Sequence, residues 1–444
     1  MIRYHARWVV PISSPPFRDG TVVEDRGRIV YVGSRQSAPP GTDIELGNCA
    51  LLPGLVNAHT HLELTVMRGF LEDLDFRSWI ARLTKARRDM LSSEALLDSA
   101  RAGIAEGLLA GITTYADTND SSAPFHAMLE LGVRGISYQE VFGPHPDQCA
   151  QSLGGLKQKV EALRGQESTL VRVGVSPHAP YSVSDVLFAA TAEFARDEAL
   201  PIAVHIAESE DESRLIAAAT GAWADGHRSR GIPVVIRAAS PIRLLEKTRV
   251  LDARPLLIHC VRTDATDIAA IRLHDCGVAH CPASNAKLGH GVAPLLDLLD
   301  AGVRVGVGSD SVASNNAMDL LVEARLASLM QRANAKRHNA ITPAEALALV
   351  TLGSARALGL DGEVGSLDVG KSADLAAFPL DHRATDPVYD PVNALVFAGG
   401  SHHARFVAVA GTVLVSEGQL TGAAVRAVDL TPYANALDAW SRAQ

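Results

Sequence analysis

Short hydrophobic runs alternate with longer amphipathic stretches through the middle of the chain. The runs are rich in Val, Ile and Leu, and each is followed by a segment rich in Ala, Leu and Glu with helical periodicity. Apolar strands that alternate with amphipathic helices indicate a parallel sheet buried on both faces. About eight such units favour an α/β fold of the (β/α)8 barrel type over an open doubly wound sheet. The predicted strands cover residues 51–56, 112–116, 133–138, 171–176, 202–206, 256–259, 277–280 and 303–307.

Both ends of the chain have a different pattern, with short strands separated by turns. Residues 21–24 and 28–32 alternate around Asp25-Arg26-Gly27, which predicts a hairpin. Strand-like runs with Gly at the turns return at 373–378, 406–409 and 412–415. We therefore expect a small β-sandwich domain built from residues 1–50 and 372–444, and a catalytic barrel domain from 51–371.

Two segments interrupt the alternation and are candidates to cover the mouth of the barrel. Residues 71–90 form a long crossover with an apolar face that includes Trp79, and residues 221–254 form an insertion without a clear strand. Loops at the carboxyl ends of barrel strands carry function in this fold, so either segment could act as a lid. For the insertion, a plain surface excursion is an equal alternative.

Composition and charge restrict the partners. The net charge is -9, which argues against nucleic acid and against an anionic membrane surface. The apolar stretch at residues 8–12 is too short for a signal peptide core or a membrane span. The five cysteines form no CxxC pair and are typical of reduced thiols in a cytoplasmic protein. A small-molecule substrate is the expected partner.

The chemistry is predicted to sit where the strands end. His59 and His61 follow the first strand, and residues two apart in an extended segment point to the same side, so both imidazoles can reach one ion. His205 ends the fifth strand and Asp310 follows the eighth. Three imidazoles and one carboxylate, with a position left open, suit one Zn²⁺ per chain, and Fe²⁺ is the alternative. The segment around Gly308 lacks the third glycine of a dinucleotide loop.

Glu208 and His259 lie close to these ligands along the chain. Glu208 comes three residues after His205, where the strand gives way to a loop, and His259 ends the sixth strand. The Glu208 carboxylate can therefore sit beside the metal without binding it.

Several motifs together resemble the amidohydrolase superfamily. They are the segment 53–61, His178-Ala179-Pro180-Tyr181-Ser182, His205 with Glu208, His259, Gly308-Ser309-Asp310-Ser311 and the segment 365–375. The branch that looks most similar contains methylthioadenosine/S-adenosylhomocysteine deaminases, aminodeoxyfutalosine deaminases and chlorohydrolases. The resemblance implies that His59, His61, His205 and Asp310 hold a single metal, because the fourth strand ends without the lysine of two-metal members. It implies proton-handling roles for Glu208 and His259, and substrate contact for His178 and Trp79. Family members are often dimers or larger, so a homo-oligomer is compatible with it.

The implied reaction is hydrolytic deamination of a purine-type ring. The metal would lower the pKa of its water from about 15.7 towards roughly 7. His259 and Asp310 would orient that water and accept its proton. Glu208, protonated, would donate to a ring nitrogen, and ammonia would leave.

The substrate beyond the ring is less constrained by the motifs. Nucleoside deaminases of this branch place a glutamate about nine residues after the tryptophan, and Trp79 leads instead to Arg88. An arginine fork prefers a carboxylate, which favours aminodeoxyfutalosine, although a solvated helix face is an equal alternative for Arg87 and Arg88. Glu140, after the third strand, is a further candidate substrate contact, and the remaining histidines, His290 among them, are interpreted as surface or structural.

Other functions would use the same constellation. Methylthioadenosine, S-adenosylhomocysteine, adenosine, guanine or cytosine deamination and hydrolytic dechlorination of an aminotriazine share these ligands. A non-catalytic scaffold of this superfamily would normally lack one or more of them, and all four are present.

Overall fold

Two parallel sheets of four strands form the centre of the molecule. The computed structural model describes residues 1–399, 403–421 and 428–443. Within the sheets the strand orders are β6-β7-β8-β9 and β10-β11-β12-β13, so neighbours in space are neighbours in sequence. The first sheet contains β6 (Leu55–Thr60), β7 (Ile112–Asn119), β8 (Arg134–Val141) and β9 (Val171–Pro177), and the second contains β10 (Ala203–Ile206), β11 (Leu256–His259), β12 (Gly277–His280) and β13 (Arg304–Val307).

The two sheets adjoin at both of their edges. A single parallel bridge joins Val175 of β9 to Ile202, and another joins Thr60 of β6 to Asp310. Continuous ladder pairing is confined to each four-stranded sheet. The α/β class is confirmed, and seven of the predicted strands coincide with β7 to β13. The first, 51–56, is corrected: it spans the end of β5 (Cys49–Pro53), in the nine-stranded sheet, and the start of β6. The register of parallel strands brings all of their carboxyl ends to one end of the molecule.

A third sheet of nine strands combines both ends of the chain. Its order is β17-β16-β15-β14-β5-β1-β2-β3, with β4 paired to β1. Hydrogen bonding makes one sheet of these strands, which corrects the expectation of two stacked sheets. They are β1 (Ile2–Val9), β2 (Phe17–Asp25), β3 (Arg28–Ser34), β4 (Thr42–Glu45), β5 (Cys49–Pro53), β14 (Leu375–Pro379), β15 (Phe406–Val409), β16 (Thr412–Ser416) and β17 (Gln419–Leu420).

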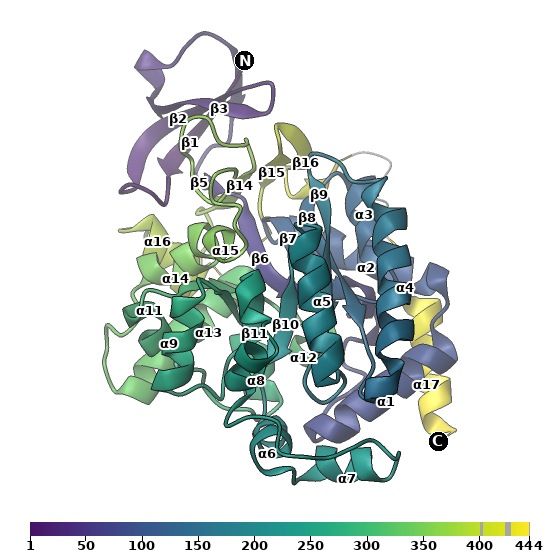
Figure 1. Ribbon diagram of the computed structural model, residues 1–444. Coiled ribbons are helices and arrows are strands. Elements are labelled where there is room, and N and C mark those ends of the chain that lie inside the picture. The colour runs from purple at the N-terminus through teal and green to yellow at the C-terminus, as the bar shows by residue number, and fades with distance from the viewer. Residues whose placement is uncertain (400–402, 422–427, 444) are drawn as a thin grey trace.

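Helices cover the parallel sheets and the end of the molecule remote from the nine-stranded sheet (Figure 1). Helix α17 (Thr431–Arg442) lies beside α1 (Phe76–Met90), not on the nine-stranded sheet. The other described helices are α2 (Ser93–Leu109), α3 (Ala123–Leu131), α4 (Cys149–Arg164), α5 (Asp185–Asp197), α6 (Glu210–Ala218), α7 (Ala222–Arg228), α8 (Pro241–Lys247), α9 (Ala265–Leu273), α10 (Pro282–Lys287), α11 (Leu295–Asp300), α12 (Val312–Asn315), α13 (Leu320–Ala335), α14 (Pro343–Leu349), α15 (Leu352–Ala357) and α16 (Pro391–Asn393). Short 3-10 helices occupy Arg35–Ser37, Leu62–Met67, Pro146–Gln148 and Leu251–Ala253, and a π-helix occupies Ala394–Ala398.

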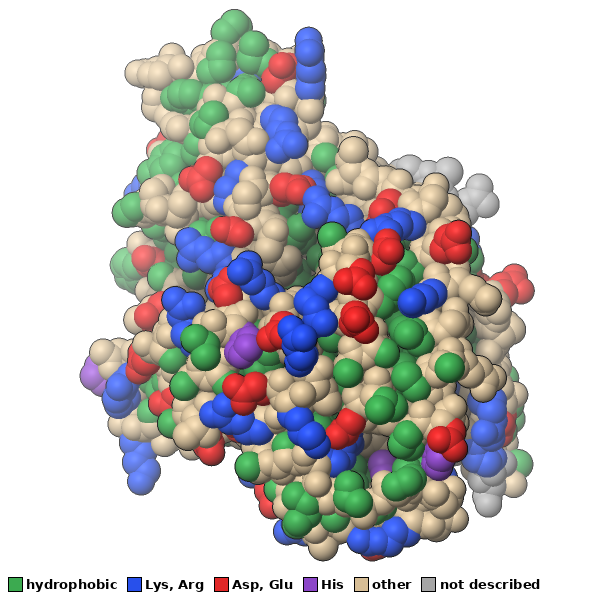
Figure 2. Space-filling model, viewed as in Figure 1, with side chains coloured by type: hydrophobic (Ala, Val, Ile, Leu, Met, Phe, Trp, Pro, Cys, Tyr) green, Lys and Arg blue, Asp and Glu red, His purple; other side chains and the backbone are tan. Residues whose placement is uncertain are grey.

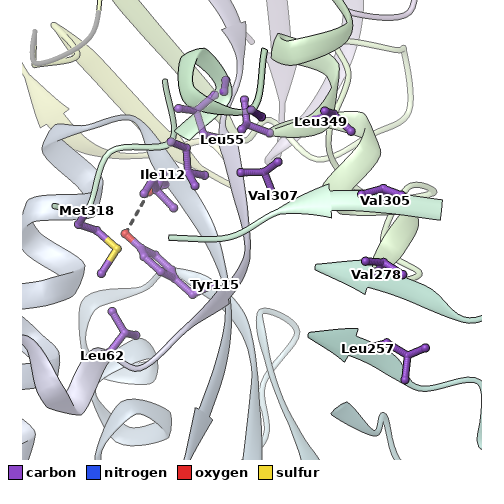
Figure 3. Close-up of a cluster of buried hydrophobic side chains, with 14 of the residues drawn as sticks. Leu55, Leu62, Ile112, Tyr115, Leu257, Val278, Val305, Val307, Met318 and Leu349 are labelled. Carbon is purple, nitrogen blue, oxygen red and sulfur yellow. Dashed lines mark hydrogen bonds between the residues drawn. The ribbon is translucent and has the colours of Figure 1, made fainter. Parts of the chain in front are cut away.

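Aliphatic side chains fill the space between the strands and the helices around them. Figure 3 shows Leu55, Ile112 and Val307 converging from three different strands, all fully buried. The hydroxyl of Tyr115 donates hydrogen bonds to the carbonyls of Ile104 and Ile112, so its polar atom is satisfied within this apolar cluster. Each fully buried side chain of this size contributes about 1.5–3 kcal/mol to folding. This packed core gives the strand ends a rigid base.

Charges of both signs are mixed on the face of the molecule that Figure 2 shows. Among the described residues, no helix combines the length and apolar character needed to cross a bilayer.

Candidate active site

A cluster of imidazoles and one carboxylate lies where the strands of both sheets end. His59 is the penultimate residue of β6 and is fully buried, and its Nε2 lies 3.2 Å from Asp310 Oδ1. Nε2 of His61 lies 3.7 Å from the same oxygen and 3.3 Å from Nε2 of His205, at the end of β10. A tetrahedral zinc ion roughly 2.0–2.1 Å from each ligand separates the ligand atoms by about 3.3 Å. Two groups of candidate ligands share His59: one adds His61 and His205, the other adds His259 and Asp310, and within each group the ligand atoms lie within 4.8 Å of one another.

The protonation states of the cluster also suit a cation. Burial lowers the pKa of His59, lowers that of His61 to about 3 and lowers that of His205 well below its ordinary value, so the three imidazoles are neutral. Burial alone would raise the pKa of Asp310, but the imidazoles around it, His59 first among them, outweigh burial and hold that pKa well below its ordinary value. Both ring nitrogens of His59 are buried without a hydrogen-bond partner. Neutral imidazoles, an ionised carboxylate and orphaned nitrogens fit a bound divalent metal.

Two residues of the cluster, His259 and Asp310, have unusual backbone conformations. His259 and Asp310 have φ angles of 78° and 57°, in the left-handed region that non-glycine residues rarely adopt. Only glycine fits at position 308, because a Cβ added there would lie 2.6 Å from the His59 amide nitrogen. This close approach lets the Asp310 amide donate to the His59 carbonyl at 3.0 Å. The Gly-x-Gly spacing thus serves close packing beside His59.

Hydrogen bonds fix the Asp310 carboxylate from behind. Ser284 and Ser314 donate their hydroxyls to Asp310 Oδ2, at 2.5 Å and 3.2 Å. Its other oxygen, Oδ1, faces His59 and His61. The carboxylate therefore divides its two oxygens between positioning contacts and the cluster.

Glu208 lies beside the cluster between two histidines. Its Oε1 is 3.4 Å from Nε2 of His259 and 3.4 Å from Nε2 of His290. Burial raises the pKa of Glu208, but the adjacent imidazoles of His259 and His290 outweigh burial, and the net pKa lies below its ordinary value. The surroundings therefore favour an ionised Glu208, in contrast to the protonated form expected from the motifs. Glu212 accepts the backbone N–H groups of Ala207 and Glu208, at 2.8 Å and 3.0 Å, and so fixes this turn.

A pocket of about 440 Å³ opens directly onto the cluster. Its floor carries the polar groups described above, and its walls carry aromatic and aliphatic side chains from α1, from the loop after β9 and from α7. The lining includes His61, Glu63, Leu64, Phe76, Trp79, Ile80, Leu83, Thr84, Arg87, Asp120, Glu140, Phe142, Pro144, His178, Tyr181, Ser182, His205, Glu208, Trp223, Arg230, His259, Leu288, Asp310 and Ser311.

Three of the expected substrate contacts line this pocket. Trp79 presents its ring from α1 and is nearly buried. His178 Nε2 lies 3.9 Å from Glu140 Oε1, and burial lowers the pKa of His178 to about 4, so its ring is neutral. Burial and the nearby charge of Asp120 raise the pKa of Glu140 well above its ordinary value, and its Oε1 is buried without a hydrogen-bond partner. The pocket wall thus carries a neutral carboxyl group with unused hydrogen-bonding capacity.

Arg88 does not belong to this pocket, which corrects its predicted role. Its side chain is 71% exposed and pairs with Asp89 at 3.1 Å. The helical turn of α1 directs Arg87 inward instead, where its Nη2 lies 2.8 Å from Glu63 Oε1 and the guanidinium also pairs with Asp120. Arg87 is therefore neutralised within the protein.

The sequence interpretation missed His290 and the role of the insertion. His290 is 5% exposed, and its ring meets the ring of Phe76 edge-on at 4.6 Å while contacting Glu208. The one sequence feature that could have pointed to His290 is its position just after α10, the short helix that follows β12. The insertion, read as lid or excursion, contributes Trp223 and Arg230 to the pocket lining.

Imidazoles and a carboxylate gathered at the carboxyl ends of parallel strands are the arrangement found in metal-dependent hydrolases. The model of the Amidohydrolase family matches residues 50–414, and the chain belongs to that family. It is accordingly a hydrolase that acts on C–N bonds.

Relatives of known name match nearly the whole chain. A 5-methylthioadenosine/S-adenosylhomocysteine deaminase from Moorella thermoacetica is 32% identical over 417 residues, covering 93% of each chain. The crystal structure of an adenosine deaminase from Xanthomonas campestris with bound zinc has a TM-score of 0.87 and 27% identity, covering 100% of this chain and 99% of that one. Atrazine chlorohydrolase from Arthrobacter aurescens complexed with zinc has a TM-score of 0.83 and 27% identity, covering 99% of each chain. The expected resemblance is confirmed.

Proposed function

We propose that the chain hydrolytically deaminates the purine ring of an adenosine-type nucleoside, with the ring bound above a single metal ion. The observation that carries the proposal is the joint placement of four ligand atoms and Glu208 at the floor of an aromatic pocket. The names of the relatives, which include nucleoside deaminases, support it.

His59, His61, His205 and Asp310 would hold one Zn²⁺ per chain, with Fe²⁺ as the alternative. Zinc accompanies two of the related crystal structures. The ion would supply a water whose pKa is lowered to about 7. Asn285 Oδ1 lies 3.0 Å from Nδ1 of His259 and orients that ring towards the cluster.

Glu208 and His259 would move the protons. Glu208 would accept one proton of the attacking water and donate it to a ring nitrogen, while the hydroxyl adds to the adjacent carbon. His259 and Asp310 would orient the water, accept the remaining hydroxyl proton as the carbonyl forms, and pass it to the amine, which leaves as ammonia. His290 and His259, both beside Glu208 Oε1, would hold the carboxylate in place between the two transfers. Each proton transfer of this kind contributes about 10²–10⁴-fold to the rate.

The pocket walls would orient the nucleoside. Trp79 provides an aromatic face for the base or its substituent, the neutral His178 ring provides a hydrogen-bonding edge, and the unpartnered Glu140 carboxyl can bond a sugar hydroxyl. Buried polar atoms normally have a hydrogen-bond partner, so an unpartnered carboxyl oxygen in the pocket wall is a good candidate to bind substrate.

Aminodeoxyfutalosine remains the particular nucleoside that we predict. Arg88, on which that prediction first depended, lies outside the pocket. Methylthioadenosine, S-adenosylhomocysteine and adenosine are the alternatives, and guanine, cytosine and a chlorotriazine are tests of other ring chemistries. Homo-oligomerisation and a lid motion of residues 221–254 stay predictions. We also infer that the two sheets act as one (β/α)8 barrel, joined through the bridges at Val175 and Thr60.

Ammonia release from the purified, metal-assayed protein tests the proposal. We expect release from at least one adenosine-type nucleoside, and loss of about 10²-fold or more in kcat for Glu208→Gln with the metal retained. Near-normal turnover by Glu208→Gln would exclude the assigned role of Glu208. Ammonia from guanine or cytosine alone, chloride from the chlorotriazine alone, or no product from any substrate despite one bound metal per chain, would reject the nucleoside proposal.

A further inference from the structure

The insertion forms one side of the pocket mouth, and its position is fixed. Trp223 of α7 stacks on Tyr181 with ring centroids 4.3 Å apart and planes 8° apart. Nε2 of His227 lies 2.8 Å from the Tyr181 carbonyl oxygen. These contacts hold α7 and the turn after it against the loop that carries His178.

Arg230 extends from that turn into the lining of the pocket. Its amide donates to the His227 carbonyl and its Nε donates to the Gly226 carbonyl, both at 3.0 Å. Throughout the described part of the chain, no carboxylate lies within ion-pair distance of its guanidinium. The Nε contact orients the planar group and leaves its two terminal nitrogens available, and a planar guanidinium of this kind matches a carboxylate or phosphate.

A second guanidinium, that of Arg77 in α1, lies against Gly226 of α7. A Cβ added at Gly226 would lie 3.0 Å from Nη2 of Arg77, the second residue of α1. Arg77 likewise lacks an ion pair within residues 1–399, 403–421 and 428–443, whereas its neighbour Arg228 pairs with Asp225 at 2.9 Å. Arg77 therefore adds positive charge beside this turn, but of the two arginines only Arg230 is among the residues that line the pocket.

The other charged side chains of the pocket favour an anion beside Arg230 rather than beside Arg87. Arg87, the other cation of the lining, is already neutralised by Glu63 and Asp120. A substrate carboxylate placed near that group would face two acidic side chains. A negative group on the substrate is therefore accommodated at the mouth, away from the metal cluster.

We infer that Arg230 forms an anion subsite that selects nucleosides whose 5′ substituent ends in a carboxylate or phosphate. The inference rests on the proposed deaminase function and names the substrate class of that same pocket. It assigns to Arg230 the specificity that the motifs suggested for Arg88.

Steady-state kinetics of Arg230→Ala, with Arg228→Ala as the matched control, test the subsite. The carboxylated substrates are S-adenosylhomocysteine and aminodeoxyfutalosine, the phosphorylated substrate is adenosine 5′-phosphate, and the uncharged substrates are methylthioadenosine and adenosine. We expect Arg230→Ala to lower kcat/KM about tenfold or more for anionic substrates, mainly through KM, and to leave uncharged substrates within about twofold. The class of anion that shows the selective loss identifies the source. Arg228→Ala should change neither class.

Equal losses on anionic and uncharged substrates, or no loss on either, would overturn the subsite. Arg230→Lys keeps the charge without the fork and should recover only part of the affinity. If no nucleoside is deaminated, the proposed function fails separately. Calorimetric binding of S-adenosylhomocysteine and methylthioadenosine to the metal-loaded protein and to Arg230→Ala then decides the subsite: a selective loss for S-adenosylhomocysteine supports it, and no selective loss rejects it.

Discussion

A buried cluster of charged side chains lies at each end of the parallel strands, and the two clusters differ in how far the protein itself satisfies their polar atoms. At the amino end of β8, Arg134 is 5% exposed and Asp374 is 1% exposed, with Nε and Oδ2 2.8 Å apart. Arg134 also contacts Glu363 and Ser372, and Asp374 accepts the Ala410 amide at 2.8 Å. Every partner there is another group of the chain.

The carboxyl ends of the strands show the opposite situation. His59 has two buried nitrogens without hydrogen-bond partners, and Glu140 has one such oxygen. Buried polar atoms are normally satisfied, and an unsatisfied group is costly unless a ligand completes it. The comparison teaches that burial alone does not distinguish the two clusters. The two clusters differ because the chain itself pairs the buried charges around Arg134 but leaves polar atoms of His59 and Glu140 unpaired beside the pocket.

The largest effect is expected from Asp310→Asn. An amide keeps the shape of the side chain but removes the negative charge that a divalent ion needs, so metal content and turnover should both fall, turnover by more than about 10³-fold. Metal analysis and ammonia release measure the two losses. Because an ion that binds only the folded state stabilises it, chelation should lower the Tm of the wild type and hardly affect this variant. A metal-loaded, active Asp310→Asn protein would contradict the site.

Breaking the satisfied cluster should instead reduce stability. Arg134→Met leaves Asp374 buried without its cation, which should lower the free energy of unfolding by about 3–5 kcal/mol. Denaturant titration measures the loss, while kcat and metal content of the folded fraction should stay near wild type. A variant with both Arg134→Met and Asp374→Leu is the control, and it should recover much of the stability. A selective loss of kcat in Arg134→Met with unchanged stability would break the comparison.

Glu140 tests whether an unpaired atom beside the pocket binds substrate. Burial and the charge of Asp120 raise the pKa of its carboxyl group, which favours the neutral form. Glu140→Gln preserves a neutral hydrogen-bonding group and should keep KM within about threefold of wild type. Glu140→Ala removes the group, and the loss of one substrate hydrogen bond should raise KM about tenfold. Steady-state kinetics with one active nucleoside measure both. If the two variants are equally impaired, the side chain acts as an ionised group instead.

The strands and the metal cluster could be predicted from the sequence because their signals are local. The predicted runs at 256–259 and 277–280 coincide with β11 and β12. His59 and His61 follow from the period of a strand, and the superfamily resemblance connects them to Asp310. His290 and Arg230 could not be predicted, because their roles depend on which loops meet at the pocket mouth. Helix α1 shows the same limit on a smaller scale: the periodicity indicates a helix, but the direction in which each arginine points depends on packing.

The smallest effects concern the two adjacent arginines of α1. Arg88 is 71% exposed and contacts only Asp89, so Arg88→Ala should change stability by less than about 0.5 kcal/mol and leave kcat/KM unchanged for anionic and uncharged nucleosides alike. Arg87→Ala should cost more in stability than Arg88→Ala, because it leaves Glu63 buried beside Asp120 without a cation. Denaturant titration and the substrate series described for Arg230 measure both variants. A selective loss for carboxylated substrates in Arg88→Ala would restore the role first predicted for Arg88, and would mean that α1 turns this side chain towards the substrate on binding.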